Sequence, residues 1–144
     1  MVEPDTIKLL RECDAGIKMG VESIGEILDY VKDEKLKNIL AEYREKHEKL
    51  KDEIQNFLEQ YHDEGKNPNP VAKGMSWMKT NVKLVMDESD ETIADLITDG
   101  CNMGVKSLNK YLNQYKAADE KTKDIAKRLI NMEESLAIDI RKYL

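Results

Sequence analysis

Three polar residues occupy positions where the sequence otherwise places apolar residues. His47, Glu133 and Asp14 each lie in a row of residues three or four apart whose other members are mostly apolar. Such rows form the buried face of a helix, so all three side chains are expected in a core. A buried polar group needs a partner, because an unpaired charge there costs several kcal/mol. An imidazole facing a carboxylate is the simplest pairing, and we expect His47 to face Glu133.

The same residues are also candidates for a metal site. Imidazole and carboxylate groups both bind metal ions, and a catalytic zinc ion takes three protein ligands. His47, Glu133 and Asp14 could therefore hold a single ion, and this hypothesis stands beside that of a core hydrogen bond. No other cofactor is indicated. Nucleophilic catalysis is not indicated either, because the sequence has no glycine-rich phosphate loop and no Ser or Cys at helical spacing from His47.

Pairs of glycines recur within predicted helices. The stretch "GIKMGVES", residues 16–23, returns as "GCNMGVKS", residues 100–107. Each glycine costs about 1 kcal/mol relative to alanine in a helix interior, so some other feature must offset that cost. Either a neighbouring helix approaches closely, or the glycines leave room for a larger side chain or a ligand. The four positions are Gly16, Gly20, Gly100 and Gly104.

The glycines and the polar residues are expected to share one layer of the fold. Counted from the turns, Gly20, His47, Gly104 and Glu133 fall near the midpoints of four predicted helices. Asp14 lies about one and a half turns from Gly20, so it is either a neighbour of this central layer or lies at its edge.

Four amphipathic helices account for most of the chain. Apolar residues spaced three and four apart predict helices over about 4–32, 34–61, 90–115 and 120–143. Asp33 and Asp119 stand where N-caps of the second and fourth helices are expected. The sequence therefore predicts an all-α fold.

The two halves of the chain repeat each other. "DEKLKNI", which begins at Asp33, matches "DEKTKDI", which begins at Asp119. This match predicts a single domain, 1–144, built from two related helical hairpins at about 4–63 and about 90–144. A long crossover, about 64–89, joins them, and its apolar spacing predicts a short helix within it.

The sequence resembles the ferritin-like superfamily and, within it, a bacterial family of four-helix-bundle proteins of unknown function. The resemblance rests on "DAGIKMG", "VKDEKLK", "VAKGMSWMKTNVKL" and "DGCNMGVKSLNKY", and it spans nearly the full chain. It implies a crossover that returns along the bundle and a pseudo-twofold axis through the central layer.

The ligand set of ferritin-like di-iron proteins is largely missing. Those proteins use a Glu on each of two helices and a Glu-x-x-His motif on the other two. Here Arg44 stands three residues before His47 in place of the Glu, and Leu136 stands three residues after Glu133 in place of the His. A di-iron oxidase or an iron store is therefore not expected.

Composition narrows the classes of partner. The 144 residues carry a formal charge of −6, so nucleic acid is not an expected partner. No apolar run is long enough for a membrane span and the N-terminal residues lack the pattern of a signal peptide, so we expect a cytoplasmic protein with no membrane association. The two cysteines, Cys13 and Cys101, are expected as buried reduced thiols.

The sequence leaves three kinds of function open. The first is a non-catalytic interaction or structural protein, acting through its surface as a homodimer or with another protein. Trp77 and Leu84 support it, because they point away from the apolar face of the predicted crossover helix and are candidates for an interface. The alternative for Trp77 is that it packs against an adjacent helix of the bundle. The second is a protein that binds a metal ion or a small ligand at the central layer, through His47 and Glu133 alone or together with Asp14. The third is a stress or storage protein, which needs only a soluble and stable helical fold.

Overall fold

The computed structural model describes residues 2–68 and 89–144 of the chain. Within these ranges it contains helices and no β-strand, which confirms the predicted all-α class. The predicted crossover helix, together with Trp77 and Leu84, lies outside the described residues. The helices are α1 (Pro4–Ile27), α2 (Glu34–Gln60), α4 (Asp90–Gln114) and α5 (Glu120–Ile140), with the 3₁₀ turns η1 (Leu28–Tyr30) and η2 (Arg141–Tyr143).

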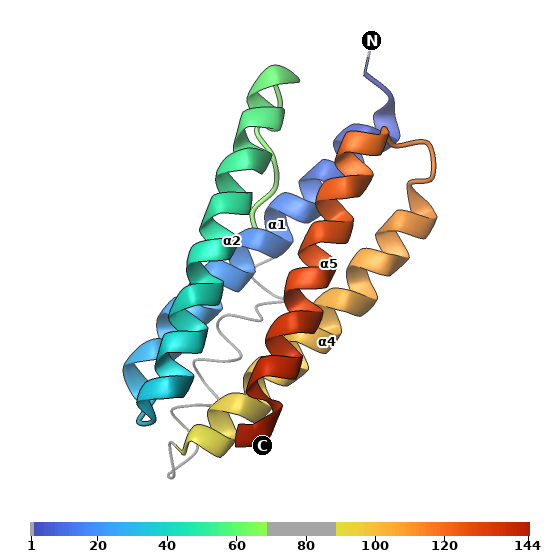
Figure 1. Cartoon of the computed structure of the whole chain (residues 1–144). Coiled ribbons are helices and arrows are strands. Elements are labelled where there is room, and N and C mark those ends of the chain that lie inside the picture. The colour runs from blue at the N-terminus through green and yellow to red at the C-terminus, as the bar shows by residue number, and fades with distance from the viewer. Residues whose placement is uncertain (1, 69–88) are drawn as a thin grey trace.

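The four long helices pack side by side as a bundle (Figure 1). Helices α1 and α2 form one hairpin, and α4 and α5 form the other. Helix α1 also packs against α5 and α4, while α2 packs against α5. None of the helices in the described ranges is both long and apolar enough to cross a membrane.

Side-chain caps fix where α2, α4 and α5 begin, and the caps of α2 and α5 are the two that the sequence predicts. The Asp33 carboxylate accepts a hydrogen bond from the backbone N–H of Leu36 at 2.9 Å, and that of Asp119 accepts one from Thr122 at 2.8 Å. Both aspartates satisfy backbone donors that the first turn of a helix leaves without partners. The two predicted N-caps are therefore confirmed.

The first helix is shorter than predicted. Regular α-helix stops at Ile27 rather than at Lys32, and the chain continues as the 3₁₀ turn η1. The reason lies at the start of α4, where the Asp90 carboxylate accepts hydrogen bonds from the backbone N–H groups of Lys32 at 2.9 Å and Asp33 at 2.8 Å. These two donors bind a distant carboxylate instead of the carbonyl groups that would continue the helix.

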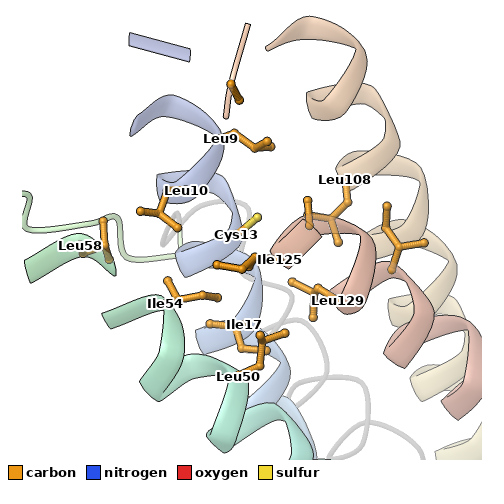
Figure 2. Packing of buried hydrophobic residues seen from close by; sticks show 13 residues of the cluster. Leu9, Leu10, Cys13, Ile17, Leu50, Ile54, Leu58, Leu108, Ile125 and Leu129 are labelled. Atoms are coloured by element: carbon orange, nitrogen blue, oxygen red, sulfur yellow. The ribbon is translucent and has the colours of Figure 1, made fainter. Parts of the chain in front are cut away.

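The apolar core consists of two clusters, one at each end of the bundle. One surrounds the α1–α2 turn and includes Ile27, Leu36 and Ile140. The other lies toward the opposite end and draws leucines and isoleucines from all four helices (Figure 2). Burying one such side chain contributes about 1.5–3 kcal/mol, so these clusters hold the helices together. The polar residues of the central layer lie between them.

Candidate functional site: a groove over a buried histidine–glutamate pair

A buried hydrogen-bonded pair joins α2 to α5. The Nε2 atom of His47 lies 2.5 Å from Oε1 of Glu133. Its Nδ1 atom lies 2.6 Å from the backbone oxygen of Tyr43, one turn earlier in α2. The side chain of His47 is only 1% exposed and that of Glu133 is 14% exposed. Both ring nitrogens of His47 are therefore occupied inside the protein.

The surroundings favour a protonated imidazole. The Tyr43 carbonyl can only accept, so Nδ1 donates to it. Burial lowers the pKa of His47, but the hydrogen bond to Glu133, the charge of Glu133 and the Tyr43 carbonyl together outweigh that effect, and the pKa is raised. Nε2 then donates to the Glu133 carboxylate. Because Nδ1 is a donor and one proton lies between Nε2 and Oε1, the pair is neutral as a unit.

Groups from α1 and α4 complete this layer. A Cβ atom placed on Gly20 would lie 2.9 Å from Cδ2 of His47. One placed on Gly104 would lie 3.7 Å from both Cγ and Oε2 of Glu133. Burial raises the pKa of the Cys101 thiol, and the nearby Glu133 carboxylate raises it further. Helices α2 and α5 thus supply the pair, and α1 and α4 supply the groups around it.

A groove of about 390 Å³ opens over this layer, between α1 and α4. The repeated stretches supply its two walls with the same residue types at the same spacing. Its floor comes from His47 on α2 and from Leu129, Glu133 and Leu136 on α5. The wall positions are Gly16, Met19, Gly20 and Ser23 on α1, and Gly100, Met103, Gly104 and Ser107 on α4.

The two explanations for the glycines apply to different positions. Gly20 allows a close approach, because any Cβ there would press against the buried ring of His47. At Gly16 and Gly104 the nearest described atoms would lie 3.8 Å and 3.7 Å from an added Cβ, which is ordinary van der Waals contact. Packing among the described residues therefore requires a glycine at position 20 but not at 16 or 104.

The rim of the groove carries a balanced ion pair and one further acidic residue. Lys66 Nζ lies 2.6 Å from Glu12 Oε1, so these two charges offset one another. This pair raises the pKa of Lys66, chiefly through its hydrogen bond to Glu12. Asp99, the other charged residue that lines the rim in the described ranges, is exposed and stays hydrated.

Asp14 belongs to a separate polar cluster. Its carboxylate is fully buried and accepts hydrogen bonds from Lys18 Nζ at 2.8 Å, Gln55 Nε2 at 2.6 Å and the backbone N–H of Lys66 at 2.9 Å. It anchors the segment that follows α2 to α1 and α2. Gly65, at φ +79°, supports this contact, because a Cβ there would collide with the Asp14 carboxylate.

The three residues predicted as metal ligands are not brought together. His47 and Glu133 contact each other, whereas Asp14 binds Lys18, Gln55 and Lys66. Across residues 2–68 and 89–144, no group of three or more His, Cys, Asp or Glu side chains could hold a metal ion. The physical reason is that Asp14 finds its own donors about one and a half turns from the level of Gly20.

Some residues at these sites were not predicted from the sequence. Met19 and Met103 occupy corresponding places within the repeated stretches, so the repeat itself carried a signal for them. Lys66 and Gln55 carry no such signal, because their contacts depend on how the segment after α2 returns to α1. Cys13, buried and not disulfide-bonded, lies outside the groove, and burial raises the pKa of its thiol to about 12.

No family model, curated protein or solved structure matches this chain. The resemblance to the ferritin-like superfamily therefore remains a prediction from the sequence.

Proposed function

We propose that the chain is a non-catalytic helical-bundle protein whose groove binds a small, largely apolar molecule. The observation that carries this proposal is the groove itself, which has matching Gly-Met-Gly-Ser walls and one polar pair in its floor. The proposal includes a ferritin-like arrangement of two repeated hairpins joined by a crossover. The matching wall residues on α1 and α4 support that arrangement.

The size and lining of the groove suit a small organic ligand. Its volume of about 390 Å³ lies within the range of about 300–1,000 Å³ that is usual for ligand pockets. The lining is mostly apolar, with few polar groups, as in most such pockets. Met19 and Met103 stand on opposite walls, and methionine side chains adapt to ligands of irregular shape.

The state of His47 supports binding rather than catalysis. A general base needs a ring nitrogen that can reach a substrate proton. In His47 both nitrogens are committed, one to Tyr43 and the other to Glu133. The imidazole thus serves to hold the Glu133 carboxylate in place beneath the groove.

Methyl NMR of methionine tests the proposal within the full chain. With ¹³C-methyl methionine and indole as the probe, Met19 and Met103 should shift in a saturable manner. Met132 serves as the internal reference, because it packs against the apolar core and does not line the groove.

A matched pair of variants locates the binding. Gly104→Leu places a bulky side chain inside the groove and should abolish the indole-dependent shifts. Lys106→Leu adds the same side chain at an exposed position of α4 that does not line the groove, and it should leave them unchanged. If indole does not shift Met19 or Met103 in the wild-type protein, the proposal is wrong.

Self-association through Trp77 and Leu84 stays a prediction, because both residues lie outside the described ranges. A homodimer or another protein partner is therefore not part of this proposal.

A further inference from the structure

We infer that the groove selects an uncharged ligand with a hydroxyl group, an aliphatic or aromatic alcohol, whose O–H donates to Oε2 of Glu133, the carboxylate oxygen that does not bind His47. This inference rests on the proposed function and names the chemical class of the ligand.

The polar pair in the floor offers the ligand an acceptor. His47 has no N–H left to donate, because Tyr43 and Glu133 take both. In Glu133, Oε1 binds His47, while Oε2 lies on the side of Gly104, 3.7 Å from where a Cβ of that residue would be. A carboxylate has about four lone-pair sites. Glu133 can therefore accept a further hydrogen bond in addition to the one from His47, even with the Cys101 thiol close by. A ligand that binds the floor must therefore bring a donor.

The balance of charge favours a neutral donor. His47 and Glu133 already neutralise each other, and so do Lys66 and Glu12 at the rim. An ammonium group would add a positive charge that nothing in the floor compensates, in a mostly apolar groove. A carboxylate ligand would lose its own hydration and also face the Glu133 carboxylate.

A hydroxyl fits this position better than an amide N–H does. A hydrogen bond from a hydroxyl group to a carboxylate is short and charge-assisted. A hydroxyl can also accept while it donates, and Ser23 and Ser107, one on each wall, have hydroxyl groups that can serve as donors. The apolar remainder of the ligand would lie against Met19 and Met103.

A matched series of probes tests the inference at neutral pH. The series is 1-octanol, methyl heptyl ether, octylammonium and octanoate, each titrated while the Met19 and Met103 methyl signals are followed. We expect the alcohol to bind about tenfold to hundredfold more tightly than the ether, because a hydrogen bond to a charged group contributes that much. Both ions should bind more weakly than the alcohol.

Glu133→Gln supplies the matched variant. Its amide N–H₂ can donate to a neutral His47, which keeps the pair bonded and the fold intact, and leaves a neutral acceptor for the ligand. The preference for alcohol over ether should then fall to severalfold, as expected for hydrogen bonds between uncharged groups.

The outcomes separate this inference from the proposed function. If alcohol and ether bind equally, or if octylammonium binds most tightly, the groove still binds ligands but the selection of alcohols is wrong. An alcohol preference that persists undiminished in Glu133→Gln also contradicts the role of this carboxylate. If indole shifts the two methionines and none of the four probes does, the selection of alcohols is wrong; if indole does not shift them either, the proposed function itself fails.

Discussion

Substitution of two glycines in the same layer should change stability in opposite directions. Gly104→Ala adds a Cβ that meets Glu133 at 3.7 Å, an ordinary contact. The variant therefore gains the helix propensity of alanine without strain. The free energy of unfolding should rise by about 1 kcal/mol.

Gly20→Ala gains the same propensity but loses more in packing. The new Cβ would lie 2.9 Å from Cδ2 and 3.3 Å from Nε2 of His47. The ring cannot move away easily, because Tyr43 and Glu133 hold it on both sides. Overpacking of this kind costs about 1–3 kcal/mol, so after the gain in propensity the net change should lie between about zero and a loss of about 2 kcal/mol.

Urea and thermal denaturation measure the contrast. The two variants should differ in unfolding free energy by about 1–3 kcal/mol, and each 1 kcal/mol moves Tm by about 2–4 °C in a chain of this size. Lys106→Ala, at an exposed position of the same helix as Gly104, serves as the reference for a substitution outside the groove. If Gly104→Ala is as destabilising as Gly20→Ala, the space in front of residue 104 is already occupied in solution. The inference that the groove has room for a side chain at position 104 is then refuted.

Two further predictions concern the buried polar groups. Because the folded-state pKa of His47 is raised, the pair with Glu133 stabilises the fold fully below the unfolded pKa of about 6.5, and this contribution is lost as pH rises through the folded pKa. The unfolding free energy of the wild type, measured by urea denaturation at a series of pH values, should thus decline as the pH rises above about 6.5. In Glu133→Gln the unfolding free energy should depend less on pH. If it declines equally in both proteins, the charged pair is contradicted. Asp14→Ala removes the acceptor for Lys18, Gln55 and a backbone N–H, and it should lower the unfolding free energy by about 1–3 kcal/mol in urea titrations. An unchanged urea midpoint would show that these donors find other partners.

Local patterns in the sequence were sufficient to predict the four long helices, although not the end of the first one. Spacings of three and four identified the helices, and short polar side chains at Asp33 and Asp119 marked where two of them begin. These features depend on residues within one or two turns of each other. The same spacings placed His47 and Glu133 on the buried faces of their helices, and they were therefore expected to contact each other.

Contacts between distant segments decided what the sequence could not. The Asp90 carboxylate ends the first helix early, and the segment after α2 supplies the backbone N–H that binds Asp14. The repeat made Gly20 and Gly104 look equivalent, yet a histidine ring lies against one and a carboxylate at ordinary contact distance lies near the other. Their difference arises because α2 presents His47 closely to α1, while α5 leaves space in front of α4. The groove depends on these interhelical distances, which periodicity along a single helix does not specify.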